Sequence, residues 1–212
     1  MNELPGVVTH NYHPVRGPFR NICELPRSEA DRVLRAIAAT GARTIKPNYL
    51  ERRFATEEWL QAEKQRKLGS TPLARPIYFF LGDLADGQDA SRPLSIIMPL
   101  AEFAPEIVTF TYPDSMASVT IAQHDGHVGH RKDYHGQVFT LHEIKDVIAR
   151  HGMPADRWKT EPSMQYDKFV EMQVWDDRPI NQFLDREPGC GHPRPGTARA
   201  GCALRDCARD RT

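Results

Sequence analysis

The order in which strand patterns and helix patterns follow one another restricts the fold of this 212-residue chain more than any other feature. Short runs of β-branched and aromatic residues predict strands, and apolar residues spaced three or four apart predict helices. Strands are expected at residues 7–15, 77–81, 95–100, 107–112, 118–122 and 169–175, and helices at about 26–40, 47–67 and 140–151. Because four strands follow one another with no helix between them, the order favours an α+β fold with mainly antiparallel strands.

The length and composition fit one globular domain. Hydrophobic residues make up 40% of the chain, and 28 Lys and Arg balance 28 Asp and Glu, so no overall positive charge favours nucleic acid. We expect the domain to cover residues 5–184. Beyond Leu184, Gly, Pro, Arg and Ala dominate and large apolar residues are rare. Residues 185–212 are therefore predicted to be a disordered tail.

The sequence also favours a cytoplasmic location. The chain does not open with a basic segment followed by an apolar run, and nowhere do about 18 consecutive apolar residues occur. Of the four cysteines, only Cys23 falls inside the expected domain, which is not the pattern of a disulfide-rich secreted protein. We expect no membrane partner.

The strand expected at residues 169–175 has an apolar face and an unusual polar face. Alternation places three apolar side chains on the first face, which suits a core: Val170, Met172 and Val174. The second face carries Glu171 and Gln173 between two large aromatic side chains. An apolar wall with a few polar groups is typical of a ligand cleft. The alternative is a half-exposed strand whose Glu and Gln face water.

The order of the elements resembles that of the ADP-ribosyltransferase superfamily. The likeness rests on His10 or His13 in the segment THNYH, on Tyr78 in PIYFF and on Glu171 in FVEMQVW. It covers about residues 7–180. The chain lacks the His-Gly-Thr, Ser-Thr-Ser and Glu-x-Glu signatures of that superfamily.

This resemblance implies NAD-dependent ADP-ribosyl transfer or NAD hydrolysis, with a nucleotide as the small-molecule partner. The resemblance does not identify the acceptor of the ADP-ribosyl group. Glu171 would stabilise positive charge on the ribose and orient the sugar. The catalytic residues implied are Glu171, Tyr78 and His13. The NAD-binding residues implied are His10, Arg16, Arg20 and Gln173. The choice between His10 and His13 stays open.

A histidine-containing loop gives a second hypothesis, a metal-dependent hydrolase that uses zinc. The loop at residues 123–137 contains His124, His127, His130 and His135, and imidazole is a common zinc ligand. The glycines of this loop and the spacing of its histidines match no helical zinc motif. A solvated loop is the alternative interpretation.

A third hypothesis is a non-catalytic binding domain. The helix at 47–67 carries many charges, including Arg52 and Arg53, which are typical of a solvated helix face although the pair could contact an anion. The three hypotheses differ in what they require. NAD chemistry needs Glu171, a first-strand His and Tyr78 in one cleft; a metal site needs the loop histidines to converge; a binding domain needs an exposed apolar patch.

Overall fold

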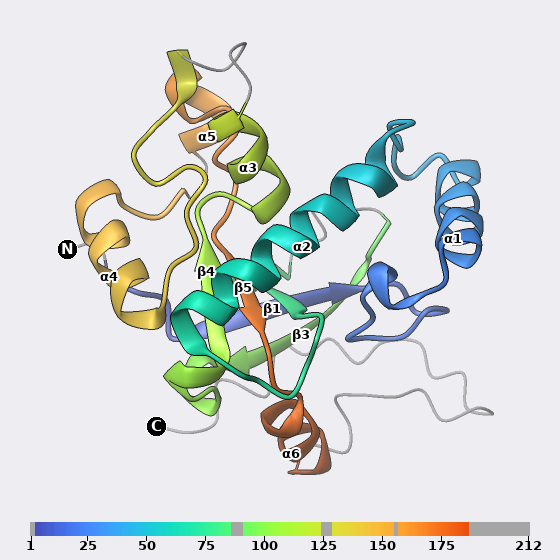
Figure 1. Ribbon diagram of the computed structural model, residues 1–212, viewed down its shortest axis with the longest axis horizontal. Coiled ribbons are helices and arrows are strands. Elements are labelled where there is room, and N and C mark those ends of the chain that lie inside the picture. Colours follow the sequence, from blue (N-terminus) through green and yellow to red (C-terminus); the bar gives the residue numbers. More distant parts are fainter. Residues whose placement is uncertain (1–2, 86–90, 124–128, 155–156, 187–212) are drawn as a thin grey trace.

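Five antiparallel strands form one sheet in the order β3-β1-β2-β5-β4 (Figure 1). The structure, a computed structural model, describes residues 3–85, 91–123, 129–154 and 157–186. The strands are β1 (Val7–Tyr12), β2 (Ile77–Leu81), β3 (Leu94–Pro99), β4 (Val108–Thr111) and β5 (Glu171–Val174). The predicted α+β fold with an antiparallel sheet is confirmed.

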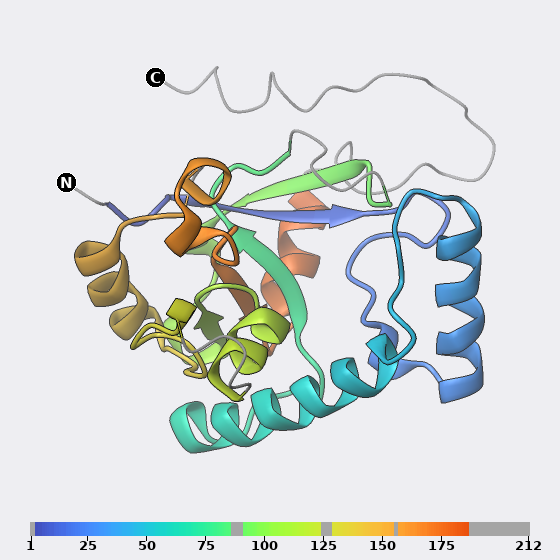
Figure 2. The same cartoon turned by 90° about the horizontal axis from the view of Figure 1, so that it is seen from above.

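Helices pack around this sheet. The α-helices are α1 (Arg27–Ala39), α2 (Tyr49–Leu68), α3 (Ser115–Gln123), α4 (Leu141–His151), α5 (Arg157–Thr160) and α6 (Arg178–Arg186). Short 3-10 helices are η1 (Ile22–Glu24), η2 (Leu100–Glu102), η3 (Pro105–Ile107) and η5 (Pro162–Met164). Figure 2 shows α2 and α3 next to each other on one side of the sheet. Within the described residues, no helix combines the length and the apolar character needed to cross a membrane.

The three predicted helices are present as α1, α2 and α4. The start of α4 follows from its sequence, because Thr140 and Glu143 form a capping box. The Thr140 hydroxyl accepts the N–H of Glu143, and the Glu143 carboxylate accepts the N–H of Thr140. These two hydrogen bonds satisfy backbone groups that a helix end otherwise leaves unpaired.

The prediction of a strand at residues 118–122 is wrong, because these residues lie in the helix α3. The sequence Ser-Val-Thr-Ile-Ala has the β-branched content of a strand. However, the Asp114 carboxylate accepts the N–H of Ala117, and the carbonyl of Asp114 accepts the N–H of Ser118, which begins a helix. Arg52 then joins α2 to α3 by donating to the hydroxyl of Thr120. Packing thus overrides a local preference for strand.

The sequence interpretation also missed α6. This helix begins after Asp176, whose carboxylate accepts the N–H of Arg178. Ile180 of α6 is buried in the main core. The helix includes Asp185 and Arg186, the first two residues of the predicted tail, and residues 187–212 lie outside the described part of the chain.

The sheet has one apolar and one polar face. Residues paired directly across strands share a face. The register pairs Thr9 with Phe80, Phe80 with Glu171, and Thr111 with Glu171. The polar face therefore carries Thr9, Tyr78, Phe80, Thr109, Thr111, Glu171 and Gln173. The apolar face belongs to the main core, whose buried members include Val8, Phe79, Met98, Phe110, Met172 and residues of α4.

Candidate functional site

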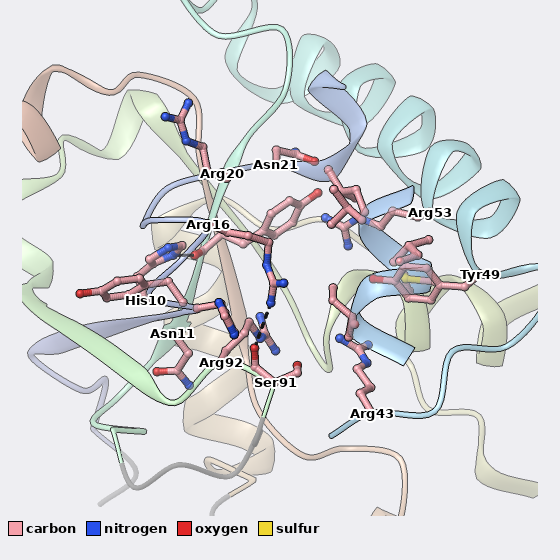
Figure 3. Close-up of a pocket in the computed structure, with 18 of the residues that line it drawn as sticks. His10, Asn11, Arg16, Arg20, Asn21, Arg43, Tyr49, Arg53, Ser91 and Arg92 are labelled. Atoms are coloured by element: carbon pink, nitrogen blue, oxygen red, sulfur yellow. Dashed lines mark hydrogen bonds between the residues drawn. The ribbon is translucent and has the colours of Figure 1, made fainter. Parts of the chain in front are cut away.

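A pocket of about 510 Å³ lies against the polar face of the sheet, where α1, α2 and the segment after β1 also contribute to its wall. Its volume falls within the range of pockets that bind small molecules. In Figure 3, His10 and Tyr49 lie on opposite sides of the pocket. The lining residues come from segments that are far apart in the sequence, so only the folded chain creates this site.

Arginines are prominent in the wall of the pocket. Five of them line it: Arg16, Arg20, Arg43, Arg53 and Arg92. In Figure 3 the side chains of Arg16 and Arg92 reach toward the middle of the pocket, whereas Arg20 extends away from it. The guanidinium of Arg16 donates to the carbonyl of Ser91 at 3.2 Å. A cluster of guanidinium groups suits an anionic ligand such as a phosphate.

Glu171 brings a buried carboxylate to this pocket. The residue is only 6% exposed. Among the described residues, the hydrogen bonds to its carboxylate both end on Oε1. They come from the N–H of Ser115 at 3.2 Å and the amide of Gln173 at 3.1 Å. Burial raises the pKa of Glu171, the positive charge of Arg53 opposes this shift, and the negative charge of Asp114 adds to it.

Asp114 is a second carboxylate in the pocket wall. Burial raises the pKa of Asp114, while hydrogen bonds from the backbone N–H of Ala117 and Met116 and the charge of Arg53 act in the opposite direction. Two carboxylates and one guanidinium thus share one end of the pocket.

Arg53 and Tyr78 are held in place by the buried carboxylate of Glu57. Glu57 Oε1 accepts hydrogen bonds from Arg53 at 2.8 Å, from Tyr78 Oη at 2.5 Å and from the Asn21 amide at 3.0 Å. The guanidinium of Arg53 also stacks on the Tyr78 ring. Glu57 is fully buried, and Arg75 lies 3.8 Å from its other oxygen. Tyr78 and Arg53 therefore enter the pocket as a rigid pair.

His10 has both ring nitrogens occupied. Its Nδ1 lies 2.7 Å from the carbonyl of Tyr78, and its Nε2 accepts the N–H of Phe19 at 2.8 Å. Burial lowers the pKa of His10 to about 4, so the ring is neutral at physiological pH. His10 lines the pocket, yet alternation along β1 places its side chain on the face opposite to Thr9, where the ring packs on Phe19 and Phe79.

The other predicted site residues are distributed as follows. His13, Arg16 and Arg20 line the same pocket as Glu171 and Tyr78. The Nδ1 of His13 accepts the N–H of Val15 at 3.2 Å. Gln173 has no exposed surface and lies behind Glu171 instead. The condition for NAD chemistry set by the sequence, a first-strand His, Tyr78 and Glu171 in one cleft, is met.

The histidine loop gives no metal site in the part of the chain that the structure describes. His124 and His127 lie outside the described residues. His130 Nε2 is 3.1 Å from the Gln165 amide, and His135 donates to the Asp167 carboxylate at 2.9 Å. Among residues 3–85, 91–123, 129–154 and 157–186, no three His, Cys, Asp or Glu side chains are grouped so that they could hold a metal.

Large exposed apolar side chains are few in the described segments. Among the described residues these are Val15, Leu94 and Tyr166. Isolated apolar residues of this kind are ordinary on a protein surface. They provide no specific support for a binding domain.

The sequence interpretation assigned no role at the site to several residues that line the pocket: Asn11, Arg43, Tyr49, Arg92 and Asp114. It treated Arg53 as part of a solvated helix face, yet α2 buries Glu57 and Lys64 on the side that carries Arg53. The available signal was the spacing of four between Arg53 and Glu57, which allows an ion pair on one helix face. Whether this face of α2 points to solvent or to the interior depends on the sheet that packs against the helix, which the spacing alone does not show.

Comparison with known proteins gives no match to a protein-family model, a curated protein or a solved structure.

Proposed function

We propose that the pocket binds NAD and that the protein cleaves the bond between nicotinamide and ribose, either by hydrolysis or by transfer of the ADP-ribosyl group to an acceptor. The observation that carries this proposal is that Glu171, Tyr78 and the arginines line one pocket. NAD contains two phosphates, two riboses and two aromatic rings. Guanidinium groups, a carboxylate and aromatic side chains are the matching partners.

The residues of the pocket divide these tasks. Arg16 and Arg92 reach toward its middle, where they can bind the pyrophosphate. Tyr49, Phe80 and Phe169 offer ring surfaces at the wall. Glu171 supplies the carboxylate that stabilises positive charge at the ribose as the carbon–nitrogen bond breaks. The electron pair of that bond leaves with nicotinamide, and the oxygen of water or of an acceptor bonds to the ribose carbon and loses its proton.

The pair formed by Glu171 and Asp114 favours this role over a purely structural one. Burial of two carboxylates near each other costs stability unless they are fully compensated. Arg53 compensates them only in part, because it also forms the ion pair with Glu57. Groups kept in such an environment are more frequent at active sites than elsewhere.

The proposal is tested by nicotinamide release from NAD⁺ with the purified full chain, with and without cell lysate as a source of acceptors. We expect release by the wild-type protein and a loss of roughly a hundredfold in Glu171→Gln, which keeps the shape but removes the charge. Glu106→Gln, at an exposed position in η3, is the matched control and is expected to keep full activity. Absence of release in all mixtures, with folded protein, contradicts the proposal.

A second measurement separates binding from chemistry. Arg92→Ala removes a guanidinium from the pocket and is expected to raise KM about tenfold, the effect of losing one charge-assisted hydrogen bond to phosphate. Arg35→Ala changes an exposed arginine of α1 and is expected to leave KM within about twofold. Equal effects of the two changes would show that the arginines of the pocket do not bind the nucleotide.

A further inference from the structure

A chain of hydrogen bonds runs behind Glu171 through completely buried side chains. The indole Nε1–H of Trp175 donates to Thr109 Oγ1 at 2.8 Å, and the hydroxyl of Thr109 donates to Gln173 Oε1 at 3.0 Å. The Nε2 amide of Gln173 then donates to Glu171 Oε1 at 3.1 Å. Trp175, Thr109 and Gln173 have no exposed surface, so water does not compete for these bonds.

The donor-to-acceptor direction of these hydrogen bonds is fixed by Trp175. An indole nitrogen can only donate, so Thr109 Oγ1 must accept from Trp175 and can use its own proton toward Gln173. The carbonyl oxygen of the Gln173 amide therefore faces Thr109, and its nitrogen faces Glu171. Without the Thr109 proton, the amide could turn over and present its oxygen to the carboxylate.

The strand register brings these groups together. The pairing of β4 with β5 places Thr109 opposite Gln173 and Thr111 opposite Glu171. The amide of Gln173 also donates to Thr111 Oγ1 at 3.1 Å. Thr109 and Thr111 thus contact the same amide but differ in function, since Thr109 donates to its oxygen and Thr111 accepts from its nitrogen.

We propose that Trp175 and Thr109 orient the amide of Gln173 and that Gln173 in turn positions the Glu171 carboxylate in the pocket. Gln173 is then a positioning residue and does not contact the nucleotide. This inference rests on the proposed function for the catalytic role of Glu171, while the hydrogen bonds themselves are independent of any ligand.

The carboxylate has other charged and titratable neighbours, which the test leaves in place. Arg53 faces Glu171 from α2, Asp114 faces it from the start of α3, and Tyr78 faces it from β2. The N–H of Ser115 is its second hydrogen-bond donor. A donor to the ionised carboxylate favours ionisation, so loss of the Gln173 donor makes Glu171 harder to ionise.

The experiment compares two variants with the same change of side chain. Thr109→Val keeps the shape of the residue and removes both the proton that orients the amide and the acceptor of the Trp175 indole, whereas Thr111→Val removes only an acceptor. The carboxyl carbon of Glu171 is followed by NMR titration in the full chain, with no nucleotide present. We expect Thr109→Val to move the titration midpoint upward by about one pH unit, a tenfold change in the ionisation constant. Thr111→Val is expected to leave it in place.

The proposal is overturned if folded Thr109→Val titrates as the wild type does, or if Thr111→Val shifts the midpoint by the same amount. Gln173→Met removes the donor itself and gives a second test should Thr109→Val fail to fold; an unchanged midpoint in this variant is equally contradictory. If the wild type releases nicotinamide, Thr109→Val should lower kcat mainly at acid pH and leave KM within about twofold. If the wild-type protein releases no nicotinamide, the proposed function is wrong. The NMR titration then still tests whether Gln173 positions the Glu171 carboxylate.

Discussion

The guanidinium carbon of Arg53 lies 4.1 Å from the centre of the Tyr78 ring, and both side chains donate a hydrogen bond to Glu57 Oε1. A helix residue and a strand residue are thus joined through one buried carboxylate. The three groups fix the position of α2 relative to β2 at the wall of the pocket. The geometry of the site therefore depends on a residue that does not line it.

Loss of the Glu57 charge is expected to destabilise the protein. Glu57→Gln leaves Arg53 buried without its ion-pair partner, and removal of one member of a buried pair costs about 3 kcal/mol in the free energy of unfolding. The adjacent Glu58 is exposed on the same helix, so Glu58→Gln should change stability by less than about 0.5 kcal/mol. Urea denaturation of both variants measures the difference, and similar midpoints would argue against a role for Glu57 in holding the helix.

Glu171→Gln is expected to stabilise the protein at neutral pH, although it removes the charge that the proposed reaction needs. Burial raises the pKa of Glu171 in the folded state above its ordinary value of 4.5. As the pH rises above the ordinary value toward the raised folded-state pKa, the unfolded state releases this proton more readily than the folded state, so the free energy of unfolding falls over that interval. Removing the charge should raise the free energy of unfolding by about 1 kcal/mol at pH 7.

This gain should disappear as the pH falls below 4.5, where Glu171 is protonated in both the folded and the unfolded state. Thermal unfolding of the wild type and the variant between pH 4 and pH 8 gives the comparison. A variant that is less stable than the wild type at every pH would show that Glu171 supports the fold.

Asp167 is expected to contribute stability that acid removes. Burial acts to raise its pKa, but hydrogen bonds from His135, Lys132 and Tyr134 outweigh burial and lower the pKa below 3.8. The stabilisation is therefore present above pH 3.8 and is lost as the pH falls through the folded-state pKa. At pH 7, Asp167→Asn should lower the free energy of unfolding by about 3 kcal/mol.

The exposed Asp146 of α4 gives the control for this change, and Asp146→Asn should have an effect below about 0.5 kcal/mol. Chemical denaturation at pH 7 and near pH 3 measures both variants. If the deficit of Asp167→Asn is the same at the two pH values, the ionised carboxylate is not the source of the stabilisation.

Gly136 is expected to tolerate no side chain. Its φ is +73°, and a Cβ at this position would lie 2.5 Å from the Cβ of Ala122 in α3. Its N–H also donates to Ser118 Oγ of the same helix at 2.9 Å. Gly136→Ala should therefore lower stability by about 2 kcal/mol, through backbone strain and overpacking. Gly129→Ala, at a position where a Cβ meets open space, should be nearly neutral; equal melting temperatures would contradict the close contact.

Local patterns in the sequence specify the elements of this fold. The spacing of apolar residues predicts α1, α2 and α4, the capping box marks the start of α4, and alternation predicts β5 with a polar face at Glu171 and Gln173. These features depend on neighbours within a few residues, so a single sequence is sufficient to detect them. The grouping of Glu171 with Tyr78 and the first-strand histidines comes instead from the resemblance to the ADP-ribosyltransferase superfamily, and these residues line one pocket.

Contacts between distant segments determine the rest. The helix at residues 115–123 forms against α2 although its sequence has strand character, and the charges of Arg53 and Glu57 point inward because the polar face of the sheet lies beneath them. The role of Gln173 follows from the register of β4 and β5, which places Thr109 beside it. No local pattern encodes such pairings, because the partners are about 64 residues apart and meet only when the sheet has formed.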